Sequence, residues 1–239
     1  MRRRWKFLKK ILINSLLVLL FLVGFALVFN KQIKDFTIKQ TTEKYTVNNF
    51  NRKEIEKNQQ QKDASFNFDD VAPISSEAVL KAKLSNKRFP VIGGVAVPSV
   101  GINLPIFKGL SNDALLWGAG TVSETQVMGK GNYGLASHHA DKKDLLFTPL
   151  TKVKIDEKIY LTNLDKVYIY RITNIEIVSP TDVQCLDEVP NKKLVTLLTC
   201  DTLAGTNRII VQGELIDEIE VDKASQEVLG VFEMEQKTY

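Results

Sequence analysis

The stretch from residue 194 to residue 210 constrains the fold of this 239-residue chain more than any other. Residues 195–199 are mostly β-branched or aliphatic, which predicts a strand that ends at Cys200. Residues 201–207 contain glycine and asparagine and predict a loop, after which Arg208 begins a second strand. Two strands joined by a short loop usually pair antiparallel. The thiol of Cys200 should therefore lie beside the guanidinium of Arg208, a cation that favours the thiolate.

The middle of the chain repeats this alternation of short strands and turns, with few helices. Such a pattern predicts an all-β fold, either an antiparallel barrel or a sandwich. The expected strands are 91–92, 95–97, 102–107, 133–138, 158–162, 167–178, 194–200 and 208–216. Short helices are expected at 73–86, 111–117 and 143–150, with a further surface helix within 225–239.

The N-terminal segment predicts a membrane anchor. Residues 11–29 are apolar except for Asn14 and Ser15, and at about 1.5 Å per residue they span roughly 28 Å. Basic residues crowd positions 1–10, so we expect a cytoplasmic N-terminus and an extracellular domain. The alternative is a cleaved signal peptide, although its small-residue site at Gly24 and Ala26 falls inside the apolar run.

Four segments follow from this pattern. Residues 1–10 form the basic cytoplasmic end, residues 11–29 the transmembrane helix, residues 30–73 a polar stalk, and residues 74–239 the extracellular folded domain.

Composition excludes several classes of function. The net charge is only +4, and no basic stripe with interleaved aromatics points to a nucleic-acid partner. Two cysteines, Cys185 and Cys200, are too few for a disulfide framework, although one bridge between them stays open as an alternative. The histidines and cysteines lack zinc-ligand spacing, and no calcium-loop pattern is visible. We expect no metal and no cofactor.

The only two histidines are adjacent, His138 and His139, at the end of an expected strand. A cysteine with a histidine is the minimum for thiol nucleophilic catalysis, in which imidazole moves protons and the thiolate attacks a carbonyl. Arg208 cannot act as a base but could stabilise a thiolate or an oxyanion. Each residue alone has a more common structural explanation: a cysteine at a strand end is usually a small buried apolar group.

Taken together, these residues resemble a class A sortase. Residues 196–200, Thr-Leu-Leu-Thr-Cys, match the family motif Thr-Leu-x-Thr-Cys, and Arg208 matches the arginine that opens the next strand. Residues 135–139, Leu-Ala-Ser-His-His, resemble the histidine-bearing strand end, and residues 146–150 resemble the short helix after it. Residues 91–98 resemble the first strand, so the resemblance covers about residues 74–220.

The resemblance implies a closed eight-stranded β-barrel outside a Gram-positive membrane, and transpeptidation of surface proteins with a C-terminal Leu-Pro-x-Thr-Gly signal. Cys200 would attack between Thr and Gly to form a thioacyl enzyme, which an amine on lipid II or another peptidoglycan precursor would resolve. It implies His138 as acid and base, and Arg208 as stabiliser and substrate ligand. Ala136, Ser137 and Thr199 would also contact the substrate, whose Leu and Pro would lie under the 179–193 loop. The role of His139 stays open.

Two departures refine the expectation. Some class A members bind calcium through carboxylates where this chain has residues 101–105, which include none, so we expect no calcium requirement. Pilin-polymerising members usually carry a C-terminal membrane segment, and none is visible here, which favours general anchoring. Two rivals remain: a cysteine peptidase that only hydrolyses, and a non-catalytic surface β-domain.

Overall fold

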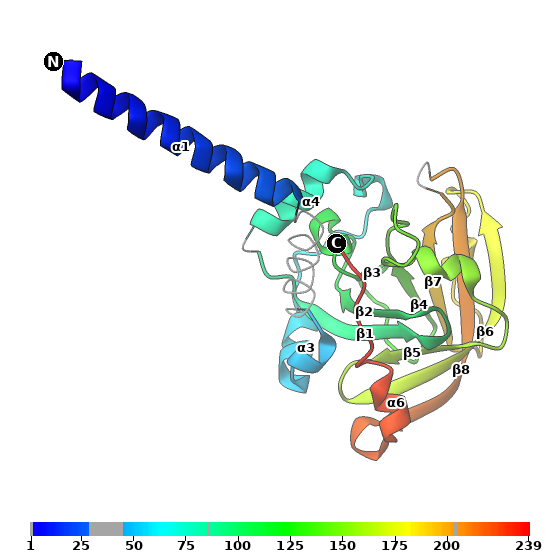
Figure 1. Cartoon of the computed structure of the whole chain (residues 1–239). Coiled ribbons are helices and arrows are strands. Elements are labelled where there is room, and N and C mark those ends of the chain that lie inside the picture. The colour runs from blue at the N-terminus through cyan, green and yellow to red at the C-terminus, as the bar shows by residue number, and fades with distance from the viewer. Residues whose placement is uncertain (1, 29–44, 86, 203–204) are drawn as a thin grey trace. The chain divides into compact units, whose positions relative to one another are not determined.

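The computed structural model describes residues 2–28, 45–85, 87–202 and 205–239, and it divides into units 1–41 and 42–239 (Figure 1). The first unit contains helix α1, Arg2–Val28, so the expected apolar run is helical through residue 28. Within the described ranges, no helix combines the length and apolar character required to span a membrane. Residues 29–44 of the expected anchor and stalk lie outside the described residues.

The second unit is built on a closed barrel in the order β1-β2-β3-β4-β7-β8-β6-β5, which confirms the expected all-β barrel with few helices. Neighbouring strands are antiparallel except for the parallel pairs β2/β3 and β4/β7. The strands are β1 Val91–Val97, β2 Ile102–Phe107, β3 Ala119–Thr121, β4 Asn132–Ala136, β5 Lys158–Thr162, β6 Lys166–Val178, β7 Leu194–Cys200 and β8 Arg208–Glu220.

Alternation along β7 separates the barrel interior from its outer face. Val195 and Leu197 are fully buried in the interior apolar core, together with Leu135 of β4. Because strand side chains alternate, Leu198 and Cys200 lie on the opposite, outer face, where both are partly exposed. The same alternation that forms the core therefore presents the Cys200 thiol outside the barrel.

The described part of the expected stalk packs against the barrel as part of the folded domain. It contains η1 (Val47–Asn49), α3 (Arg52–Gln59) and η2 (Phe68–Asp70). Its Tyr45, Val47 and Ile55 are buried in an apolar cluster on the outside of the barrel. Asn58 Nδ2 also donates to the carbonyl of Val91 at 2.8 Å. Apolar side chains spaced along this polar sequence cover β1. The folded domain therefore begins before residue 73, the expected end of the stalk.

Several expected elements differ from the structure. The strands expected at 91–92 and 95–97 are one strand, because Gly93 lets β5 approach: a Cβ there would lie 2.5 Å from the carbonyl oxygen of Thr162. The three-residue strand β3 was missed because it is too short for an alternation signal. The strand expected at 133–138 ends at Ala136.

The prediction of a helix at residues 143–150 is wrong. Leu146 has a φ of 52°, in the left-handed region, which a right-handed helix excludes. Only a short 3-10 helix, η4, forms at Thr148–Lys152, with Pro149 in its first turn. The expected helix within 225–239 is limited to α6, Gln226–Gly230, and the tail beyond it runs beside β2 towards β3 (Figure 1).

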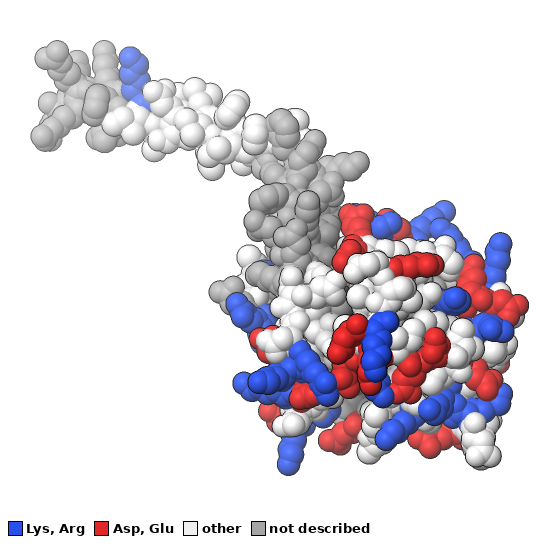
Figure 2. All heavy atoms as spheres, turned by 90° about the horizontal axis from the view of Figure 1, so that it is seen from below, with Lys and Arg blue, Asp and Glu red and all other residues white. Residues whose placement is uncertain are grey.

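The remaining short helices are α4 (Ser76–Leu84), η3 (Pro98–Val100), α5 (Asn112–Leu115), η5 (Gln184–Leu186) and η6 (Val221–Lys223). On the face seen in Figure 2, basic and acidic side chains of the folded unit are interspersed. Ion pairs such as Arg52 with Asp165 and Lys166 with Glu218, each 2.6 Å long, reflect this mixing.

Candidate active site

Cys200 and Arg208 form the last residue pair of the antiparallel ladder between β7 and β8, as the hairpin predicts. The guanidinium turns over the hairpin loop, where Nη1 donates to the carbonyls of Gly205 at 2.9 Å and Asn207 at 3.1 Å. A Cβ on Gly205 would lie 3.5 Å from Cys200 Sγ and 3.7 Å from Arg208 Nη1. The sulfur and the guanidinium therefore flank the same glycine.

Asp201 and Asn207 close the base of this loop. The Asn207 amide N donates to Asp201 Oδ1 at 3.0 Å, and its side-chain Nδ2 donates to Oδ2 at 3.0 Å. These hydrogen bonds hold the pKa of the Asp201 carboxyl below its usual value. A fixed carboxylate thus stands one residue from the thiol.

His138 lies beside the end of β7. The Ser137 amide donates to the Leu198 carbonyl at 3.1 Å, and His139 Nδ1 contacts the Cys200 carbonyl oxygen at 2.9 Å. His138 lies between Ser137 and His139 in the sequence. Its backbone therefore runs beside Thr199 and Cys200 at the end of β7. A carbonyl oxygen only accepts, so His139 Nδ1 must carry the proton. The open question about His139 thus has a structural answer: its ring binds the backbone of Cys200.

Burial shifts the pKa values of the Cys200 thiol and the His138 ring towards their neutral forms. Burial raises the pKa of the Cys200 thiol, Arg208 opposes that rise, and Asp201 adds to it. Burial alone lowers the pKa of His138 to about 4. The resting pair at neutral pH is a thiol and an uncharged imidazole, not the preformed thiolate that the hairpin alone suggests.

The other expected substrate contacts are largely covered. Ala136, Ser137 and Thr199 are 7%, 6% and 1% exposed. The Ser137 hydroxyl donates to the Gly118 carbonyl at 2.8 Å. The Thr199 hydroxyl is buried without a hydrogen-bond partner among the described residues. The side chains of these three residues therefore present little surface to solvent.

A polar network missed by the sequence analysis holds the 179–193 loop against the outer face. The Cys185 carbonyl, in η5, accepts from Asn132 Nδ2 at 3.0 Å and from Gln212 Nε2 at 3.3 Å. Thr196 Oγ1 donates to Asn132 Oδ1 at 2.7 Å, which joins β4 to β7. No single sequence motif links these residues; they converge because β4, β7 and β8 are neighbours.

Both cysteines are free, so the alternative bridge between Cys185 and Cys200 is absent. The Cys185 sulfur lies 3.6 Å from the Asp182 carbonyl oxygen, on the 179–193 loop. Across the described part of the chain, no group of three or more His, Cys, Asp or Glu side chains is placed to hold a metal ion.

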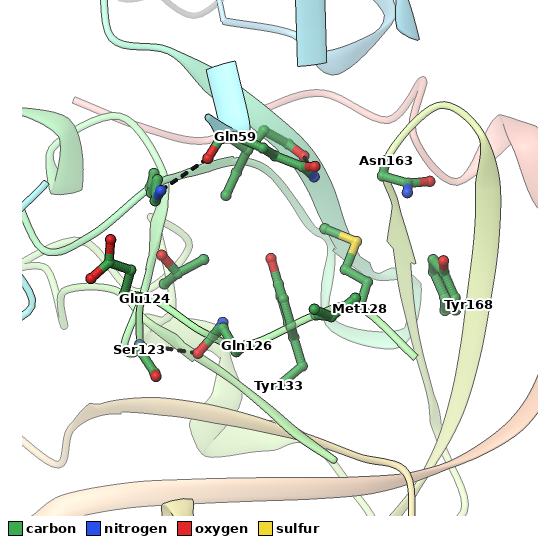
Figure 3. Close-up of a pocket in the computed structure, with 12 residues that line it drawn as sticks. Gln59, Ser123, Glu124, Gln126, Met128, Tyr133, Asn163 and Tyr168 are labelled. Atoms are coloured by element: carbon green, nitrogen blue, oxygen red, sulfur yellow. Dashed lines mark hydrogen bonds between the residues drawn. The ribbon is translucent and has the colours of Figure 1, made fainter. Parts of the chain in front are cut away.

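The structure also contains a pocket of about 150 Å³, which Figure 3 shows with its lining residues. Its lining includes Ile92 near the start of β1, Asn163 just after β5, and Tyr133 and Tyr168 near the starts of β4 and β6. The strand directions place these positions at the end of the barrel opposite the end of β7. The pocket is therefore separate from the Cys200 site.

The chain is similar to known proteins in both sequence and fold. Residues 95–216 match the sortase domain family. The chain is 45% identical over 222 residues to sortase A of Streptococcus agalactiae, covering 91% of this chain and 90% of that protein. It is 37% identical over 203 residues to sortase A of Listeria monocytogenes, covering 84% and 90%. The solved structure of Listeria monocytogenes sortase A aligns with a TM-score of 0.55 and 41% identity, covering 59% of this chain and 96% of that one.

Proposed function

Since the chain belongs to the sortase family and is a cysteine transpeptidase of the sortase A type, we propose that Cys200 is its nucleophile, His138 its acid and base, and Arg208 its electrostatic stabiliser. Members of this family anchor surface proteins. The proposed substrates are surface proteins with a C-terminal Leu-Pro-x-Thr-Gly signal, and the proposed acceptor is an amine of lipid II or another peptidoglycan precursor.

One observation carries the proposal. The hydrogen bonds on either side of His138 run to Leu198 and Cys200, while Arg208 is paired with Cys200 from the other side. These contacts of Ser137 and His139 support an arrangement in which the His138 imidazole acts on the Cys200 thiol, at the end of the barrel wall where Arg208 also lies. A thiol needs a base and a site of positive charge to attack a carbonyl, and these neighbours supply both.

The first half-reaction transfers the acyl group to sulfur. His138 takes the thiol proton, and Cys200 Sγ bonds to the carbonyl carbon of the signal threonine. The negative charge on the carbonyl oxygen lies within reach of Arg208, whose guanidinium has five N–H donors, those of Nη1 already serving the loop. The Thr–Gly bond then breaks as His138 returns its proton to the leaving glycine amine.

The second half-reaction reverses these roles. The acceptor amine attacks the thioester carbon, His138 takes the amine proton, and Cys200 leaves as a thiol after the proton returns. Water in place of the amine would give hydrolysis, so the acceptor decides between transpeptidase and peptidase.

The peptide is proposed to lie on the outer face of β4 and β7, with Ala136, Ser137 and Thr199 forming its support. Leu198 is partly exposed on this face. The 179–193 loop is held to the barrel by hydrogen bonds from Asn132 at the start of β4 and from Gln212 of β8. An apolar floor below a fixed loop suits the Leu-Pro portion of the signal.

Membrane attachment is proposed through residues 11–29, with the N-terminus in the cytoplasm. The described large apolar side chains of α1 are exposed, for example Leu12 at 72% and Phe21 at 71%. Basic residues precede this run. Alkaline extraction of membranes from cells expressing the full chain would test it: release into the soluble fraction contradicts an anchor.

The decisive experiment mixes the purified protein with a signal peptide and an amine acceptor and measures products by mass spectrometry. We expect a ligated product, none from Cys200→Ala, and wild-type yield from Cys185→Ala, the matched control at the other cysteine. Free acid without ligated product would favour the hydrolytic peptidase. Unchanged cleavage by Cys200→Ala would rule out Cys200 as the nucleophile, and no cleavage by any form would favour the non-catalytic domain.

A further inference from the structure

The tail that follows α6 packs along the barrel and ends beside the loop that carries the histidines (Figure 1). Phe232 is 2% exposed and lies in the outer apolar cluster. Asn103 Nδ2, on β2, donates to the carbonyls of Phe232 at 3.1 Å and Met234 at 2.6 Å. The tail is thus fixed to the barrel before it reaches the loop.

Three contacts join the end of the tail to the loop and its neighbour. The Leu146 amide donates to the Lys237 carbonyl at 2.9 Å. The Tyr239 hydroxyl donates to Asp141 Oδ1 at 2.8 Å, and the Tyr239 amide donates to the Leu116 carbonyl at 3.3 Å. Burial and the nearby Asp141 carboxylate both raise the pKa of Tyr239, so its hydroxyl keeps the proton that it donates.

The loop itself, residues 137–148, is irregular and closes on itself at few points. His139 forms an isolated bridge with Leu146, and the Phe147 amide donates to the His138 carbonyl at 3.3 Å. The Ala140 amide donates to Thr148 Oγ1 at 2.8 Å. Leu146 holds a left-handed φ of 52°, which a leucine adopts only where its surroundings impose it.

Leu146 therefore contacts both the tail and the rest of the 137–148 loop. Its amide donates to the tail, and its backbone pairs with that of His139. Movement of the tail at Lys237 would change the support of the loop segment that carries His138 and His139. Asp141, two residues after His139, gives the tail a second hold on the same segment.

We propose that residues 237–239 are a positioning brace, which holds the 137–148 loop so that His138 stays beside Cys200. The proposal rests on the catalytic role of His138 given above. The brace touches neither substrate nor sulfur; it acts through the loop.

The test uses full-length protein and the variants Tyr239→Phe, Asp141→Ala and the double substitution. We expect each to lower kcat for ligation about tenfold with KM for the signal peptide unchanged within about twofold, because a base displaced by a fraction of an ångström loses rate but not binding. The double variant should be no slower than Asp141→Ala, since Asp141→Ala already removes the Tyr239 contact, together with the acceptor of the Lys142 amide. Asp141→Asn keeps an acceptor oxygen and should retain more activity than Asp141→Ala.

Tyr45→Phe is the matched control, because it removes a tyrosine hydroxyl that donates to the Lys87 carbonyl at 3.1 Å, in a different part of the domain. It should keep the wild-type kcat. Equal loss of kcat in Tyr45→Phe and Tyr239→Phe, or additive losses in the double variant, would overturn the brace.

Hydrogen exchange separates the brace from the proposed function. In Tyr239→Phe, the amides of Leu146 and Phe147 should exchange several-fold faster than in the wild type, whether or not the protein ligates peptides. Failure of the wild type to ligate would overturn the proposed function, whereas unchanged exchange at both amides together with unchanged kcat would overturn the brace alone.

Discussion

Cys200 and Arg208 are paired at the end of the β7–β8 ladder, and Gly205 of the connecting loop lies close to both the sulfur and the guanidinium. The pairing brings a cation to the thiol, but burial and Asp201 outweigh it, so the thiol pKa is raised. The chemistry of this site therefore depends on a balance among three neighbours and not on the arginine alone.

Thiol reactivity should move in opposite directions when the two charges beside Cys200 are removed. Arg208→Gln removes the cation that favours the thiolate, so the pKa of the Cys200 thiol should rise further. Asp201→Asn removes the anion that opposes the thiolate, so the pKa should fall by a smaller amount. The rate of alkylation against pH, measured in a Cys185→Ala background, checks both. Shifts in the same direction would contradict the assignment of charges.

His138 should make the folded protein less stable in mild acid. Its pKa is about 4 in the folded state and 6.5 as a free side chain, so only the unfolded state binds its proton between those values. Stability from the neutral ring is fully present above pH 6.5 and is lost as the pH falls towards 4. Between pH 7 and pH 5 the loss should be about 2 kcal/mol or less.

The measurement is urea unfolding at pH 7 and pH 5 for the wild type and His138→Gln. The variant lacks the titrating ring, so its stability should fall less on acidification. An equal fall in both proteins would show that His138 titrates normally when folded.

Gly205→Ala separates backbone strain from crowding of the sulfur. Gly205 has a φ of 66°, and the added Cβ would stand 3.5 Å from Cys200 Sγ. Gly101→Ala is its matched control, with a φ of 71° and no atom within 4 Å of the added Cβ. Both should lose about 1 kcal/mol of stability, because alanine disfavours positive φ. Only Gly205→Ala should also slow alkylation of Cys200, and equal alkylation rates in the two variants would show that Gly205 does not govern access.

Sequence reasoning found what is local in the chain. The pairing of Cys200 with Arg208 follows from one hairpin. Repeated short alternation predicts an all-β barrel or sandwich, and only the family resemblance selects the closed barrel. Contacts between distant segments could not be seen, because Asn132, Thr196 and Gln212 meet only after β4, β7 and β8 become neighbours. The left-handed φ of Leu146 could not be predicted for a similar reason. The sequence there favours a helix, and tertiary contacts override that preference.

Asn132→Leu should weaken peptide binding more than catalysis. It removes the Nδ2 donor to the carbonyls of Cys185 and Asp187, which fix the 179–193 loop. Unfolding free energy should fall by about 2 kcal/mol, since a buried carbonyl loses a partner. KM for the signal peptide should rise about fivefold with kcat nearly unchanged. Lys192→Ala, on the same loop, breaks only an exposed ion pair with Glu214 and should change both constants little. A rise in KM for Lys192→Ala as large as that for Asn132→Leu would mean that the polar network is not what holds the loop.

Thr199→Val tests whether the hydroxyl of the residue before Cys200 has a structural use. Thr199 is 1% exposed, and its Oγ1 has no hydrogen-bond partner among the described residues. Valine has nearly the same shape, so the substitution removes a buried polar group without opening a cavity. The free energy of unfolding should therefore stay the same or rise by about 1 kcal/mol. Equilibrium urea unfolding measures it, with Thr196→Val as the contrast, because that hydroxyl donates to Asn132 at 2.7 Å and its loss should destabilise. A Thr199→Val protein that is destabilised as much as Thr196→Val would mean that its hydroxyl is hydrogen-bonded in solution, by water or by a neighbour that moves.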